Sequence, residues 1–149
     1  MKKIDTRKEV AISKSFQKTA KSDLNSARIL LKNKEYSNAL YHIQQAIEKV
    51  LKAMLALKGR FIFKHEVIVE FCNVFRKAVP QDFLAIVESK GFRIEQEGSS
   101  FRYPDFSGTE IFDPTKEFTK EDAEEGYRTA QKIVTMAMKE IVKMKKMMT

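Results

Sequence analysis

The sequence predicts an all-α protein, an up-and-down bundle of four main helices with a short extra helix and a long irregular loop before the last helix. In several segments, apolar residues recur at intervals of three and four, which is the spacing of one helix face. Only five glycines and three prolines occur among 149 residues, too few for the many tight turns of an all-β fold. The short connection at residues 33–35 makes the first two helices antiparallel neighbours, because a parallel pair needs a long return.

The first helix is predicted over residues 13–32, where apolar residues from Phe16 to Leu31 follow helical spacing. The twelve residues before it are basic and loosely patterned, which predicts a frayed or separately helical start. We treat residues 1–149 as a single domain, because this length is typical of one hydrophobic core.

The second helix, residues 36–59, is the central element of the prediction. Its apolar residues form one wide face: Ala39, Leu40, Ile43, Ala46, Ile47, Val50, Leu51, Met54 and Leu55. We expect Ser37 to cap its start, since a hydroxyl accepts a bond from an unpaired backbone N–H. Gly59 is a natural stop, because glycine enters the left-handed conformation without a Cβ clash.

The limits of the remaining helices are predicted from a proline, a glycine and a capping motif. A third helix is predicted over residues 65–78, and Pro80 suits the start of a short apolar helix that ends near Gly91. Residues 92–118 lose the periodic pattern, and their aromatic residues suggest a loop that packs onto the bundle. Thr119 and Asp122 have the spacing of a capping box that opens the last helix.

Composition limits the partners. The net charge of +8 favours phosphates, nucleic acid or an acidic partner, although a plain lysine- and glutamate-rich surface explains it equally well.

The single cysteine, Cys72, excludes an intrachain disulfide and fits a cytoplasmic protein. It lies in an apolar pattern, which predicts a buried, inert thiol. No apolar run approaches the ~20 residues that span a bilayer, so no membrane association is expected.

Three segments carry a resemblance to a known family. Residues 39–53 (ALYHIQQAIEKVLKA) resemble the second helix of HEPN domains, the higher eukaryote and prokaryote nucleotide-binding domains. Lys64-His65-Glu66 is similar to the start of the family's third helix, and residues 101–105 (FRYPD) to the segment before its last helix. The resemblance covers residues 22–143. It implies a helical bundle that binds a nucleotide or RNA, forms a homodimer and pairs with a minimal nucleotidyltransferase in a toxin–antitoxin-like system.

Arg60 and His65 match the R-x4-6-H motif of HEPN ribonucleases in spacing. Cleavage by 2′-OH attack needs a group that exchanges a proton near neutral pH and a cation that holds the phosphate. The match is incomplete, because Phe61 stands where the catalytic motif usually has a polar residue and the pair precedes the third helix. Alternatively, His65 caps the helix and Arg60 is solvated.

A polar row lies on the second helix at spacings of three and four residues: His42, Gln45, Glu48, Lys49 and Lys52. By the resemblance, it lines a nucleotide or RNA groove. The alternative is a structural strip of hydrogen bonds that includes a Glu48–Lys52 pair.

Arg102 and Tyr103 lie in the irregular region and form a second candidate for nucleotide or RNA binding. An arginine can hold a phosphate through two hydrogen bonds, and a neighbouring ring can stack on a base. Equally, Tyr103 can pin the loop to the bundle. Two histidines and one cysteine without ligand spacing predict no metal site, and no cofactor is expected.

Three functions remain open at this point. The first is an HEPN-type protein that binds a nucleotide or RNA beside a partner nucleotidyltransferase. The second is a metal-independent ribonuclease that uses Arg60 and His65. The third is a non-catalytic helical bundle that binds another protein.

Overall fold

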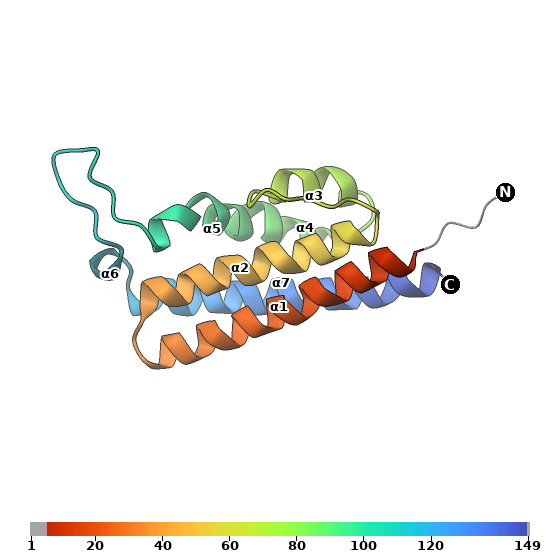
Figure 1. The fold of residues 1–149 in the computed structure, drawn as a ribbon, viewed down its shortest axis with the longest axis horizontal. Helices are drawn as coiled ribbons and strands as arrows, with labels where there is room; N and C mark the ends of the chain where they lie inside the picture. The colour runs from red at the N-terminus through yellow and green to blue at the C-terminus, as the bar shows by residue number, and fades with distance from the viewer. Residues whose placement is uncertain (1–5, 149) are drawn as a thin grey trace.

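The computed structural model describes residues 6–148, and three long helices dominate it (Figure 1): α1 (Arg7–Lys32), α2 (Tyr36–Ala56) and α7 (Lys120–Met147). Helices α1 and α2 run antiparallel, as the three-residue connection predicts. The shorter helices follow one another along α2 and return the chain to the start of α7 (Figure 1). The all-α, up-and-down prediction is therefore confirmed.

The return path is a chain of short helices where the sequence suggested two. Their bounds are α3 (Ile68–Phe75), α4 (Gln81–Ile86), the π-helical turn η1 (Val87–Gly91), α5 (Phe92–Gln96), the 3-10 turn η2 (Gly98–Phe101) and α6 (Pro114–Glu117).

Several predicted boundaries were wrong. Helix α1 begins at Arg7 rather than Ser13. Of the frayed or separately helical start expected for residues 1–12, residues 7–12 are helical and continuous with α1, and residues 1–5 lie outside the described residues. The third helix begins at Ile68 rather than His65, because a glutamate from α5 caps it there. Gly91 has φ −61° and continues the helical path instead of ending it. The absence of a side chain at Gly91 allows the chain to lie close to α7, since a Cβ at this position would lie 3.3 Å from Ile133 Cδ1.

The helix ends at Gly59 and Thr119 follow the predicted local chemistry, whereas the start of α2 does not. Gly59 has φ +71° just beyond α2, so the predicted left-handed stop is confirmed. The capping box of Thr119 and Asp122 is also confirmed, with both reciprocal hydrogen bonds present. Ser37 does not cap α2: the N-cap position is Glu35, and Ser37 is buried inside the first turn.

The irregular region is shorter than predicted and is confined to residues 102–113 between η2 and α6. One isolated antiparallel bridge joins Asp105 to Phe112. Phe118 contacts both Phe101 and Phe112 edge to face, so these rings anchor the loop to the bundle. Phe106, at the tip, is 80% exposed.

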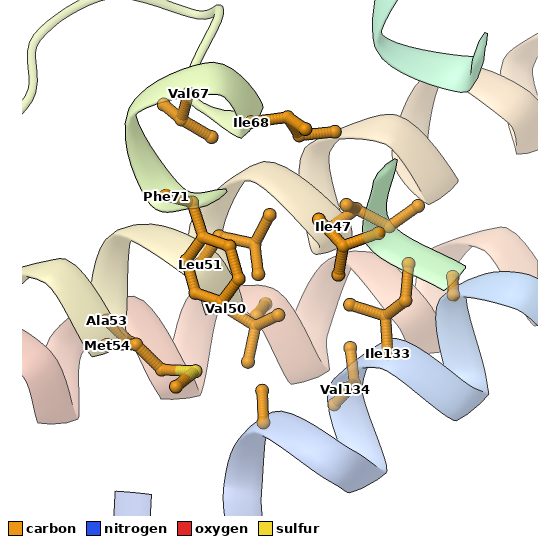
Figure 2. Packing of buried hydrophobic residues seen from close by; sticks show 14 of the residues in the cluster. Ile47, Val50, Leu51, Ala53, Met54, Val67, Ile68, Phe71, Ile133 and Val134 are labelled. Carbon is orange, nitrogen blue, oxygen red and sulfur yellow. The ribbon is translucent and has the colours of Figure 1, made fainter. Parts of the chain in front are cut away.

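The core forms around α2. Its apolar face packs against α7 through Ile133 and Val134 and against α3 through Phe71 (Figure 2). Gly126 allows α7 to approach α2 closely, because a Cβ there would lie only 2.9 Å from Leu40 Cδ2. Within residues 6–148, none of the helices combines the length and apolar character that crossing a membrane requires.

Cys72 is buried on α3, as predicted. Burial is the main cause that raises the pKa of its thiol to about 11, and the carboxylate of Glu88 adds to it. A thiol with a raised pKa favours the folded state below its ordinary value of 9.0, and this contribution is lost as the pH rises toward 11.

We therefore predict slow alkylation of Cys72. With a pKa of about 11 in the folded state and 9.0 after unfolding, roughly one folded thiol in a thousand is ionised at pH 8, against about one in ten unfolded thiols. Because only the thiolate reacts, alkylation by iodoacetamide should be at least ~100-fold slower in buffer than in urea. Equal rates in the two conditions would contradict a buried thiol.

Candidate functional site

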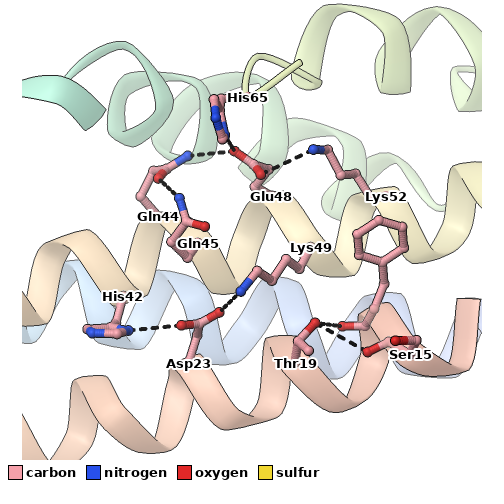
Figure 3. Close-up of polar contacts among 11 residues, drawn as sticks. Ser15, Thr19, Asp23, His42, Gln44, Gln45, Glu48, Lys49, Lys52 and His65 are labelled. Carbon is pink, nitrogen blue, oxygen red and sulfur yellow. Dashed lines mark hydrogen bonds and ion pairs between the residues drawn. The ribbon is translucent and has the colours of Figure 1, made fainter. Parts of the chain in front are cut away.

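The polar row of α2 divides into two clusters (Figure 3). The first centres on Asp23 of α1, whose side chain is 12% exposed. Its Oδ1 lies 2.9 Å from His42 Nδ1, and its Oδ2 accepts a hydrogen bond of 2.6 Å from Lys49 Nζ. Asp23 therefore ties α1 to α2 through two residues that the sequence placed in a nucleotide groove.

The second cluster centres on Glu48, which is 5% exposed. Its Oε2 accepts from Lys52 Nζ at 3.3 Å, and its Oε1 accepts from Gln44 Nε2 at 3.2 Å. The ring Nδ1 of His65 lies 3.3 Å from the same Oε1 (Figure 3). Three polar side chains from α2 and the following loop therefore converge on one buried carboxylate.

These pairings favour the structural interpretation of most of the row. Lys52 is 8% exposed, and its ammonium already donates to Glu48. A buried charge needs a partner, because desolvation without one costs several kcal/mol. Glu48 and Lys52 therefore contribute to the packing of the bundle.

A groove of about 400 Å³ lies beside the second cluster, at the junction of α2, the loop before α3, α5, η2 and the irregular loop. We call it the Arg102 groove. Four residues singled out in the sequence line it: Gln45, His65, Arg102 and Tyr103. Only the tertiary structure brings them together, since they come from three separate parts of the chain.

The main chemical feature of the Arg102 groove is a cation that lies over an aromatic ring. The guanidinium carbon of Arg102 lies 4.3 Å from the centroid of the Tyr41 ring, within cation–π range. Tyr103 is 65% exposed, so its ring does not pin the loop and can contact a ligand. Gln45 Nε2 donates to Gln44 Oε1 at 2.9 Å, so the side-chain oxygen of Gln45 takes no part in that bond.

His65 is 82% exposed on its side chain although its Nδ1 faces Glu48. A carboxylate only accepts, so in the neutral ring Nδ1–H donates to Glu48 and Nε2 carries the lone pair. This orientation leaves Nε2 available to take a proton from a ligand or to accept a hydrogen bond.

Two carboxylates, Glu66 and Glu95, also line the groove. Glu95 Oε1 accepts from the backbone N–H groups of Val67 at 2.5 Å and Ile68 at 3.3 Å, so it caps α3. Burial raises the pKa of Glu95 above its ordinary value of 4.5, and the two backbone hydrogen bonds oppose that shift. A phosphate is therefore favoured at the Arg102 side of the groove rather than beside these carboxylates.

Arg60 lies elsewhere. It donates to Glu70 at 3.3 Å and lines a separate hollow of about 750 Å³. Glu66, Glu95 and Gln96 line both hollows, so the two adjoin. Within one chain, the motif pair Arg60 and His65 therefore faces two neighbouring surfaces rather than one site.

Sequence reasoning missed Asp23, Tyr41 and Glu95. Asp23 is the only carboxylate in the α1 sequence between residues 10 and 32, and this was the available signal. No local pattern marks Tyr41 or Glu95, because their partners are 61 and 28 residues away in the sequence. Among residues 6–148, no group of three or more His, Cys, Asp or Glu side chains is placed to hold a metal ion.

The helical arrangement defines the class of this protein. The crystal structure of TT1696 from Thermus thermophilus matches it with a TM-score of 0.70 at 22% identity, covering 85% of this chain and 96% of that one. The crystal structure of ST0689, an archaeal HEPN homologue, matches with a TM-score of 0.64 at 22% identity, covering 87% and 97%. At this identity the two structures establish a shared all-α fold.

The sequence comparison then gives the family. Residues 13–141 match the HEPN domain. A protein of Methanocaldococcus jannaschii with the name "Putative toxin MJ1304" is 34% identical over 134 residues, covering 87% of this chain and 88% of that protein. The chain therefore belongs to the HEPN family, as its central helix indicated.

The Glu48 cluster generates a stability prediction. Glu48→Ala should destabilise the fold by about 3–5 kcal/mol, because it leaves the buried ammonium of Lys52 without its carboxylate. Glu48→Met with Lys52→Met should recover most of this loss, since replacing both members of a buried pair by apolar side chains is often neutral. Urea unfolding measures both changes.

A matched control is Glu66→Ala, an exposed neighbouring carboxylate whose loss should change the free energy of unfolding by less than about 0.5 kcal/mol. If the double replacement were as unstable as Glu48→Ala, an unpaired Lys52 charge would not be the cause.

Proposed function

We propose that this chain is a toxin-like HEPN protein of the cytoplasm that binds a nucleotide or RNA in the Arg102 groove. The observation that carries the proposal is the convergence of Gln45, His65, Arg102 and Tyr103 on one hollow. Family membership and the name of the M. jannaschii relative support the toxin-like class.

The groove offers the groups that recognise an unpaired nucleotide. The exposed ring of Tyr103 provides a stacking surface for a base, a contact that tolerates every base because each has a π-face. Arg102 supplies a planar cation for the phosphate, and Tyr41 holds that cation in place through its ring face. Gln45 and His65 then offer hydrogen bonds to the sugar or the base edge.

The proposal predicts loss of binding after Tyr103→Ala and after Arg102→Gln. With ATP and a short single-stranded RNA as probes at low salt, each variant should bind roughly 5- to 100-fold more weakly, because a stacked base contributes about 1–3 kcal/mol. Isothermal titration calorimetry measures both affinities.

The matched control for Tyr103 is Phe106→Ala, which removes another exposed ring from the same loop, 80% exposed and outside the groove lining. For Arg102 the control is Arg93→Gln, an exposed arginine of α5. If the wild-type chain binds neither probe, or if the control variants weaken binding equally, the groove is not the site.

The partner belongs to the proposal as well. We infer a toxin–antitoxin-like pair with a minimal nucleotidyltransferase, and a homodimer of this chain, because the family resemblance implies both. A non-catalytic protein-interaction role remains the alternative if no nucleotide binds, and copurification with the nucleotidyltransferase in the absence of RNA distinguishes it.

A metal-independent ribonuclease is a second candidate, favoured by the orientation of His65. The Glu48 carboxylate directs Nδ1 inward, and the 82% exposed side chain presents Nε2 outward as a base. Nε2 would take the proton of a ribose 2′-OH while that oxygen attacks the phosphorus, which forms a 2′,3′-cyclic phosphate and breaks the bond to the 5′ oxygen of the next nucleotide. That oxygen would leave with a proton from water. Arg60, in the adjoining hollow, would hold a neighbouring phosphate of the same strand.

This candidate predicts cleavage of RNA in the presence of a chelator. The cleavage rate should fall at least ~100-fold in His65→Ala, because general-base catalysis contributes about 10²–10⁴-fold. His42→Gln is the control, since it changes the other histidine, which faces Asp23. Cleavage that persists in His65→Ala would exclude this residue as the base.

A further inference from the structure

The positive charge of the chain is concentrated in two helical segments. Residues 7–21 of α1 contain five basic residues and one acidic residue, a net +4. Residues 132–146 of α7 contain the same numbers, again a net +4. The 110 residues between them have 16 basic and 17 acidic residues, a net −1. The basic character is therefore a property of two segments and not of the whole surface.

Within each segment, four of the five cations fall on one helix face. Both sets have the spacing i, i+7, i+11 and i+14, which returns to nearly the same direction on a helix of 3.6 residues per turn. The α1 row is Arg7, Lys14, Lys18 and Lys21, and the α7 row is Lys132, Lys139, Lys143 and Lys146. Each row is about 21 Å long, at ~1.5 Å per residue.

All eight side chains are exposed. Helices α1 and α7 pack against each other, and the start of α1 and the end of α7 lie at the same end of the molecule (Figure 1). We call the two rows together the basic face. They lie on two packed helices at the same end of the molecule, although the two segments are more than 100 residues apart in sequence.

The acidic residues of the two segments do not neutralise the basic face. Glu9 is partly buried. Glu140 is buried and binds Lys143 through Oε2 at 3.1 Å. Clusters of like charge repel one another, so such a surface is expected to be stabilised by an external polyanion.

We infer that the basic face binds the phosphate backbone of an RNA strand. The inference rests on the proposed function only in taking RNA as the ligand, since no residue of the two rows lines the Arg102 groove. A lipid surface fits less well, because membrane-bound helices place large apolar residues beside their cations. In these described segments, Val142 is the one large apolar side chain that is exposed.

The face and the groove divide the recognition of one ligand. Lysines along a helix contact phosphates without reading sequence and supply salt-dependent affinity. The Arg102 groove would receive a single nucleotide of the strand. A mononucleotide should therefore need only the groove, whereas an oligonucleotide should need both surfaces.

The test replaces three lysines of the α1 row together, K14Q/K18Q/K21Q. Glutamine keeps the helix propensity of lysine and removes its charge. The matched control is K58Q/K77Q/K116Q, three exposed lysines outside the two rows with the same total charge change. The probes are a fluorescent single-stranded RNA long enough to cross both rows, and ATP.

We expect K14Q/K18Q/K21Q to bind RNA on the order of a hundredfold more weakly at ~0.1 M salt, with the slope of log K against log salt reduced by about 2, because each lost phosphate contact lowers it by ~0.7. The control should stay near wild type, and ATP affinity should not change in either variant.

Equal weakening by the two triple variants would overturn the inference, because a general loss of charge would then explain the effect. RNA binding that is absent in the wild type, or insensitive to the α1 row, would overturn it too. Row-dependent RNA binding without any ATP binding would support the basic face and contradict the Arg102 groove, so the two proposals fail separately.

Discussion

The burial of α2 on nearly all sides is the constraint from which the rest of the structure follows. Fifteen of its 21 residues are buried, because α1, α7 and the chain of short helices cover it. A helix in this position cannot keep a solvated polar face. Its polar side chains must find partners inside the protein, since each unpaired buried charge costs several kcal/mol. Glu48 accepts hydrogen bonds from Gln44 and Lys52. Lys49 donates a hydrogen bond to Asp23 on α1.

In the proposed site, the same constraint places most of the recognition residues on loops beside the central helix. Once Lys49 and Lys52 are engaged, the cations and rings that remain accessible beside α2 come from loops, namely His65 before α3 and Arg102 with Tyr103 after η2. Loops held by a rigid scaffold are where proteins commonly place binding residues. The scaffold still contributes, because Glu48 orients the His65 ring and Tyr41 supports Arg102. In the proposed site, the central helix therefore contributes Gln45 directly and also positions the loop residues.

A division between two surfaces follows for this member of the HEPN family. The Arg102 groove combines aromatic rings, amides and carboxylates, and it suits a single nucleotide better than a long anion because Glu66 and Glu95 lie in it. The basic face has the opposite character, with regularly spaced lysines and few neighbouring acids. Under the proposed function, selectivity belongs to the Arg102 groove and electrostatic affinity to the basic face, and each can be altered without the other.

The sequence by itself determined the helical class, the central helix, its stop at Gly59 and the capping box at Thr119 and Asp122. These depend on periodicity and on contacts within a few residues, which a linear pattern records. It also supplied the family, through the motif at residues 39–53. Only the tertiary structure decided where α3 begins, since its cap is Glu95 from α5, and whether Gly91 ends a helix or admits Ile133. It likewise decided that Lys49 is bound to Asp23 and that Arg60 and His65 line different hollows. These outcomes depend on contacts between residues far apart in the chain, and such contacts form only after the helices pack.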